Sequence, residues 1–378
     1  MGGKHAPLAA NGLLRKARGG TNVGMRTTLL AAAAALALTV PVFAQEEPTG
    51  APAPSEIVAA APKADWVTIA AEDLLVMTLA PDADGTPRQV VIQLMPAPFS
   101  QGWVHNIRLF ARAGWYDGIS VNRVQDNYVT QWGDPNYDNP EATGKPKLLP
   151  EGLKVMGEDE YQEIFTYDRW IADPETPSGW NRISRSENNR LTGFDFRERA
   201  DADSYADHAQ FHSGWPVAWE LAPLLADRPP VPRNNLAYVW PTHCYGMVGV
   251  GRNMTPDTGS GAELYTVIGH APRHLDRNIA LVGRVIEGMQ HLSSLPRGSG
   301  DLGFYTAEEA AKRTPILSVR VASDLAPSEQ PEFEYLSTES GTFATYAEAI
   351  ANRRDPFFIT PAGGADICNI RVPVRRAE

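Results

Sequence analysis

The chain has 378 residues, a formal net charge of -11 and 43% hydrophobic residues, which is enough apolar material for a folded core. Its 32 glycines and 31 prolines favour a turn-rich globular fold over a helical bundle or a disordered chain. An acidic chain repels phosphate backbones and anionic membranes, so nucleic acid is not an expected partner.

The first 44 residues have the layout of a secretory signal peptide. They contain five basic residues and no acidic one, and the net charge without those five is -16. From Met25 a basic start leads to an apolar run over residues 29–38 and a small-residue ending at Ala44, the expected cleavage position. A retained membrane anchor is the alternative, but the run is too short for a comfortable span. The sequence predicts a periplasmic protein without stable membrane insertion, and it indicates no oligomeric state.

Residues 45–63 are rich in alanine, proline and glutamate and lack an apolar period, which predicts a linker. From Trp66 the texture changes to short alternating runs typical of strands, and one helix is indicated by the spacing of Ile107, Phe110 and Ala111 before Gly114. The strands expected in this part cover residues 66–69, 74–80, 88–95, 119–124 and 127–132.

Residues 136–241 are predicted to form a long insertion, because no apolar period lasts long enough to build a separate core. A helix is expected there over residues 219–226. Strand-like runs return over residues 244–251, 263–269, 279–288 and 315–325, which favours an antiparallel β barrel or sandwich. In the C-terminal extension, residues 326–378, a helix is expected over 342–354 and a strand over 367–375.

The remaining motifs point to no metal and no cofactor. His208 and His212 are spaced for a metal-binding helix, but no glutamate follows the first histidine and no cysteine is near, so a packed pair is expected. The glycine-rich residues 249–261 lack the Gly-Lys-Ser/Thr of a phosphate loop. Cys244 and Cys368 are the only cysteines, and both a disulfide and two buried thiols fit the sequence.

The run VVIQLMPAPFSQGWVHNIRLFARAGWYDGISVNRVQDNYVTQWGDP, residues 90–135, resembles the cyclophilin-type peptidyl-prolyl isomerases. Residues 243–253, 259–276 and 280–292 resemble the segments that close the family's substrate groove and barrel. The resemblance implies a mostly β fold over residues 64–325, a closed eight-stranded antiparallel barrel capped by two helices, with the C-terminal extension packed on it. It also implies isomerisation of X-Pro bonds in proline-containing polypeptides without a cofactor.

The same resemblance implies the site residues. Arg123 matches the arginine of the family's catalytic strand, and Gln131 is its catalytic neighbour. The expected substrate-binding residues are Tyr128, Val129, Gly251, Glu263, Tyr265 and Leu275.

The sequence departs from the family pattern at two of these positions and at a third, residue 279, that follows them. Glu263 stands where the pattern has glutamine, Tyr265 where it has phenylalanine, and Ile279 where it has histidine. A non-catalytic module that binds proline segments, or acts as a chaperone, is therefore the alternative hypothesis.

Overall fold

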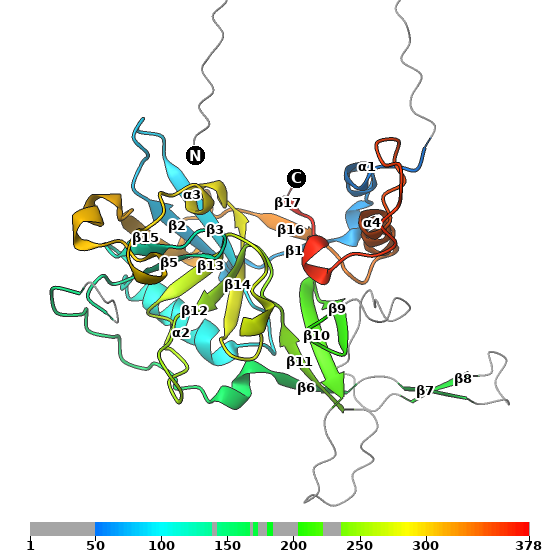
Figure 1. Ribbon diagram of the computed structural model, residues 1–378, viewed down its shortest axis with the longest axis horizontal. Helices are drawn as coiled ribbons and strands as arrows, with labels where there is room; N and C mark the ends of the chain where they lie inside the picture. Colours follow the sequence, from blue (N-terminus) through cyan, green and yellow to red (C-terminus); the bar gives the residue numbers. More distant parts are fainter. Residues whose placement is uncertain are drawn as a thin grey trace, which may run out of the picture. The chain divides into compact units, whose positions relative to one another are not determined.

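The computed structural model describes residues 50–137, 142–166, 169–172, 180–183, 203–221 and 236–377 (Figure 1). The predicted signal peptide and its cleavage position lie outside these residues. Within them, no helix is both long and apolar enough to cross a membrane.

An eight-stranded antiparallel sheet forms the centre of the fold, in the order β15-β2-β3-β14-β12-β13-β5-β4. Its two edge strands meet, because the amide of Val121 donates to the carbonyl of Thr314 and the amide of Ile316 donates to that of Ile119. The predicted eight-stranded barrel is thus confirmed. Its strands are β2 (Leu74–Leu79), β3 (Arg88–Leu94), β4 (Ser120–Val124), β5 (Val129–Gly133), β12 (Met247–Val250), β13 (Leu264–Val267), β14 (Leu281–Glu287) and β15 (Ile316–Val321).

Two helices pack against barrel strands. Helix α2 (Gln101–Arg112) contacts β15, and its apolar face is buried through Trp103, Ile107 and Phe110. Gly114 follows this helix with φ of 61°, a conformation that glycine adopts without the cost of a Cβ. The second helix, α3 (Gln290–Ser293), is a single turn that contacts β3. Helix α2 confirms the helix that was predicted from the spacing of Ile107 and Phe110.

The insertion contributes a second antiparallel sheet, in the order β6-β11-β10-β9. Its buried residues Phe165, Trp215 and Val239 belong to the same apolar core as the barrel. The predicted helix at 219–226 is wrong for residues 219–221, because these pair as a strand within this sheet. The strands of the insertion are β6 (Glu163–Thr166), β7 (Arg169–Ala172), β8 (Trp180–Ile183), β9 (His208–His212), β10 (Trp215–Leu221) and β11 (Leu236–Pro241), with β7 and β8 forming a separate hairpin.

The segments before and after the barrel pack on each other. Strands β1 (Trp66–Thr68), β16 (Phe333–Leu336) and β17 (Val374–Arg376) form a three-stranded sheet. Helices α1 (Pro54–Ala59) and α4 (Gly341–Ala351) lie side by side (Figure 1).

Three predictions for these end segments are now decided. The linker predicted over residues 45–63 is wrong for residues 54–59, because Ile57 and Val58 pack into an apolar cluster around Phe343. The helix predicted over residues 342–354 is confirmed by α4. The strand predicted over residues 367–375 is wrong for residues 367–373, of which 367–369 form a 3-10 turn, and it is confirmed only for 374–375 within β17.

Short 3-10 helices connect many of the elements in the described residues: Lys63–Asp65, Ala71–Asp73, Glu158–Tyr161, Arg273–Leu275, Asp301–Gly303, Ala307–Lys312, Ala322–Asp324 and Ile367–Asn369.

A disulfide joins Cys244, just before β12, to Cys368 in the C-terminal extension, with 5.0 Å between the Cα atoms. The sequence allowed either a disulfide or two buried thiols, and the structure has the disulfide. It ties the C-terminal extension covalently to the barrel.

Candidate active site

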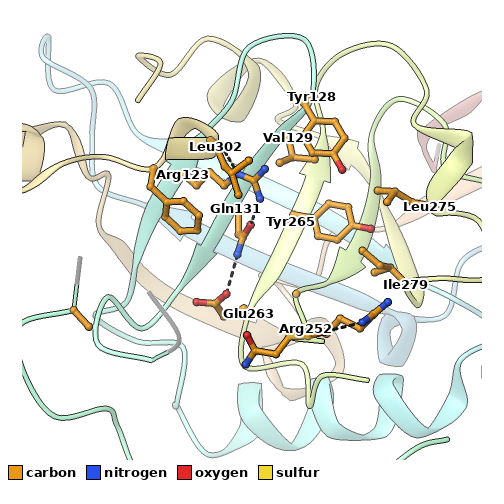
Figure 2. Close-up of a pocket in the computed structure, with 14 residues that line it drawn as sticks. Arg123, Tyr128, Val129, Gln131, Arg252, Glu263, Tyr265, Leu275, Ile279 and Leu302 are labelled. Atoms are coloured by element: carbon orange, nitrogen blue, oxygen red, sulfur yellow. Dashed lines mark hydrogen bonds between the residues drawn. The ribbon is translucent and has the colours of Figure 1, made fainter. Parts of the chain in front are cut away.

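One cavity of about 530 Å³ receives all eight residues that the sequence analysis assigned to the site. They come from β4, β5 and the turn between them, from β13 and from the loops on either side of β13, so residues more than a hundred positions apart share one pocket (Figure 2). The complete lining is Arg123, Tyr128, Val129, Gln131, Ala142, Gly251, Arg252, Asn253, Glu263, Tyr265, Leu275, Ile279, Leu302 and Phe304.

A row of directly opposed residues crosses four neighbouring strands and builds the centre of the pocket. Arg123 on β4 faces Gln131 on β5, Gln131 faces Tyr265 on β13, and Tyr265 faces Gly249 on β12. Opposed residues of an antiparallel pair lie on the same face of a sheet with their side chains in contact. The strand register therefore places the guanidinium, the amide and the phenol side by side.

The guanidinium of Arg123 is held in place from several sides. Its Nε donates to the carbonyl of Leu302 at 2.7 Å, and its Nη1 donates to Oε1 of Gln131 at 3.0 Å. It also lies over the rings of Tyr128 and Phe304, 5.6 and 5.4 Å from their centroids. Burial lowers the pKa of Arg123 from its ordinary value, with Tyr128 and other neighbours opposing the shift. Arginine titrates so far above neutrality that the side chain stays a cation.

Gln131 has one possible amide orientation in this arrangement. Arginine only donates hydrogen bonds and a carboxylate only accepts them, so the amide oxygen must face Arg123 and the NH₂ group must face Glu263. Its Nε2 donates to Oε2 of Glu263 at 2.8 Å, and the three side chains form a continuous chain in Figure 2. The buried carboxylate thus reaches the guanidinium through the glutamine and aligns it.

The other wall of the pocket is largely apolar. Val129 and Tyr265 are buried together, with Tyr128 and Ile279 packed against them, and Leu275 lies beside Ile279 (Figure 2). A wall of this kind removes water from an apolar ligand group and grips it by dispersion contacts.

Two residues that the sequence analysis missed form the rim beside Arg123. Leu302 and Phe304 belong to a loop between α3 and β15, and Phe304 makes an isolated β bridge with Arg123. Leu302 adopts a φ of 55° and is 65% exposed. Apolar residues in a loop carry no motif, so no signal in the sequence assigns them to the pocket.

The part of the chain that the structure describes contains no group of three or more His, Cys, Asp or Glu side chains arranged to hold a metal ion. The spacing of His208 and His212 belongs to strand β9 rather than to a helix, and the ring of His208 stacks on Trp219 with 3.9 Å between centroids. These histidines therefore take part in aromatic packing.

Comparison with known proteins identifies the family. Residues 89–321, more than half of the chain, match the family model described as "Cyclophilin type peptidyl-prolyl cis-trans isomerase/CLD". The chain belongs to the cyclophilin-type peptidyl-prolyl cis-trans isomerases. Membership in this family assigns the enzyme class EC 5.2.1.8 and confirms the resemblance seen in the sequence.

One solved cyclophilin shares the fold at low identity, and two further structures are less similar. A cyclophilin from Hirschia baltica superimposes with a TM-score of 0.52 and 20% identity, over 83% of this chain and 94% of that chain. A cyclophilin-type isomerase from Cryptosporidium parvum, solved in the presence of the dipeptide ala-pro, gives a TM-score of 0.32 and 11% identity. The match covers 65% of this chain and 97% of that chain. A second structure of the Cryptosporidium parvum protein matches 66% of this chain and 96% of that chain, at the same TM-score and identity. No curated protein matches this cyclophilin.

Proposed function

We propose that this cyclophilin isomerises X-Pro peptide bonds in exported proteins, with Arg123 donating a hydrogen bond to the proline nitrogen in the twisted transition state. The observation that carries the proposal is the row Arg123, Gln131 and Tyr265, which puts an aligned cation beside an apolar wall in one cavity. Proline-containing polypeptides are the substrates.

The chemistry needs no covalent step. Rotation about a peptide bond must break amide resonance, with a barrier of about 18–20 kcal/mol. In the twisted state the proline nitrogen regains a lone pair, so a hydrogen-bond donor aimed at it stabilises that state more than either planar isomer. A donor of this kind accelerates the interconversion in both directions.

Arg123 has donors available for this role. A guanidinium carries five N–H groups. Three of them are engaged with Leu302, Gln131 and Gln125 among the described residues. The remaining two have no hydrogen-bond partner among the described residues, so they are available to a ligand, and the three bonds hold the head group at the cavity wall.

The apolar wall supplies the second requirement, a grip on the proline ring. Val129, Tyr265, Leu275 and Ile279 surround a space in which a five-membered ring loses its contact with water. Holding the ring on one side of the bond while the preceding residue rotates converts binding energy into a lower barrier.

Export is the part of the proposal that rests on sequence. The signal-peptide pattern of residues 25–44 supports it, and the disulfide between Cys244 and Cys368 fits an oxidising compartment. Uncatalysed isomerisation takes about 10–100 s, which limits the folding of newly exported chains. A periplasmic isomerase removes that delay.

The test is an isomerisation assay on a proline tetrapeptide with the chain from Gln45 onward. We expect Arg123→Ala to lower kcat/KM by roughly 100- to 1000-fold, the usual cost of removing one transition-state donor. Arg297→Ala is the matched control, because this arginine pairs with Asp126 outside the pocket lining.

Two outcomes would refute catalysis through Arg123. One is an equal rate for the wild type and Arg123→Ala. The other is a wild-type rate equal to buffer, and tetrapeptide binding without acceleration would then favour the binding module.

A further inference from the structure

A chain of buried polar side chains leads from the apolar wall of the pocket into the insertion. The hydroxyl of Tyr265 lies 2.9 Å from Nε2 of His243, and Nδ1 of His243 lies 2.8 Å from Oδ1 of Asp276. Oδ2 of Asp276 accepts from Nε of Arg273 at 2.6 Å, and Nη2 of Arg273 donates to Asp203 at 2.7 Å. No side chain from His243 to Asp203 is more than 5% exposed.

The direction of each hydrogen bond follows from the chemistry of its groups. The carboxylate of Asp276 only accepts, so Nδ1 of His243 donates to it, and in the neutral ring with this tautomer Nε2 has a lone pair. The Tyr265 hydroxyl donates to that lone pair. Burial raises the pKa of Tyr265 well above its usual value, so the hydroxyl keeps its proton. Every link in this part of the chain therefore joins one donor to one acceptor.

Arg273 connects this network to the insertion. Burial alone would lower the pKa of its guanidinium, but Asp276 and Asp203 outweigh burial and raise that pKa. The same guanidinium lies 5.4 Å from the ring centroid of Tyr205. Asp203 and Tyr205 belong to the insertion, whereas Arg273 and Asp276 flank Leu275 of the pocket. One buried cation thus holds residues 203–205 against the segment that lines the pocket.

Gly249 shows that the fold makes room for the Tyr265 hydroxyl. This glycine lies directly opposite Tyr265 in the sheet, and a Cβ there would meet the hydroxyl oxygen at 2.3 Å. The hydroxyl therefore occupies space that any other residue at 249 would take. Because burying a hydroxyl is costly without a partner, His243 and Gly249 together account for its presence.

We propose that His243, Asp276, Arg273 and Asp203 are positioning residues that hold the Tyr265 ring in place, so that the insertion sets the efficiency of isomerisation. The inference rests on the proposed function of the pocket. A ring that grips proline must stay in register with Arg123, and small displacements of positioning groups cost large factors in rate. Paired buried charges suit this role, because moving one of them leaves the other uncompensated.

The test compares two carboxylates of the insertion in the chain from Gln45 onward. Asp203→Asn weakens the last link of the network, whereas Glu220→Gln removes a surface ion pair with Arg277, 2.8 Å long, that is not linked to Tyr265. We expect Asp203→Asn to lower kcat/KM by roughly three- to tenfold and Glu220→Gln to change it less than twofold.

A third variant shows whether the effect passes through the ring. Tyr265→Phe keeps the ring and removes only the hydroxyl, so we expect a similar fall in kcat/KM and no further fall when Asp203→Asn is added. A merely structural role for Asp203 would lower kcat/KM equally in both backgrounds, and this result would overturn the proposal. An unchanged kcat/KM in Tyr265→Phe would also overturn it, even if Asp203→Asn did not fold.

A readout without turnover separates this inference from the proposed function. In aromatic NMR spectra, the Tyr265 ring signal, assigned through Tyr265→Phe, should shift in Asp203→Asn and stay in place in Glu220→Gln. A wild-type rate equal to buffer would refute isomerisation, while the ring signal would still decide the coupling. An unmoved ring signal in Asp203→Asn would refute the coupling alone.

Discussion

The amide of Gln131 donates to the carboxylate of Glu263 across 2.8 Å, and both side chains are buried. Because the other end of the same amide accepts from Arg123, the carboxylate fixes the orientation of the guanidinium through one intermediary. A glutamate in this place therefore acts as an aligning group behind the cation.

This relationship predicts different outcomes for two similar substitutions. Glu263→Gln still offers an oxygen to Gln131, so we expect kcat/KM on a proline tetrapeptide to change by less than about fivefold. Gln131→Leu keeps the volume but removes both hydrogen bonds, so we expect a loss of roughly 10- to 100-fold. If Glu263→Gln lowered kcat/KM more than Gln131→Leu, the negative charge of Glu263, and not the amide bridge, would be what aligns Arg123.

Gly249→Ala should displace the Tyr265 ring in the pocket wall. The new methyl would meet the Tyr265 hydroxyl oxygen at 2.3 Å and push the ring toward the cavity. We expect a loss of about 1–3 kcal/mol in the free energy of unfolding, with a higher KM for the tetrapeptide. Gly341→Ala is the control, because a Cβ there meets nothing within 4 Å. Equal behaviour of the two variants in urea unfolding and in the assay would contradict the close packing.

The disulfide should contribute strongly to stability. It closes a segment of 124 residues between Cys244 and Cys368, and long loops gain most from a cross-link that restricts the unfolded chain. We expect the double substitution to serine to lower the free energy of unfolding by about 2–5 kcal/mol. Wild type unfolded under a reducing agent should match the double variant. No difference between oxidised and reduced wild type would show that the bond is absent or energetically neutral.

Glu309 should make the rim loop sensitive to acid. Hydrogen bonds from Lys312 and from the amides of Ser299 and Thr306 lower the pKa of Glu309 to about 2. Since an unfolded glutamate titrates near about 4.3, this contribution to stability is complete above that pH and disappears as the pH falls through about 2.

Hydrogen exchange at the Ser299 and Thr306 amides measures this loss. Their protection should decline over that acid range in the wild type, whereas Glu309→Gln should show no such decline. Protection that stays constant down to pH 2 in the wild type would contradict the role of the carboxylate.

By itself, the sequence determined the barrel strands and helix α2, whereas the residues of the candidate site were implied by the resemblance to the cyclophilin-type isomerases. Alternating apolar residues mark half-buried strands wherever they occur, and the spacing of Arg123, Tyr128 and Gln131 is local to one hairpin. Local pattern also misled in three places, one of them the strand expected over residues 367–373. Residues 219–221 became a strand because β9 and β11 flank them, and residues 54–59 formed a helix because α4 offered an apolar face.

Only the tertiary structure decided that Leu302 and Phe304 complete the pocket, and which other distant segments meet. Leu302 binds Arg123 across 179 positions, Cys368 reaches Cys244 across 124, and Asp203 meets Arg273 across 70. Such contacts depend on how the closed sheet and its loops fold back on one another. A single sequence has no periodicity that encodes them, because each arises from packing in three dimensions and not from neighbours along the chain.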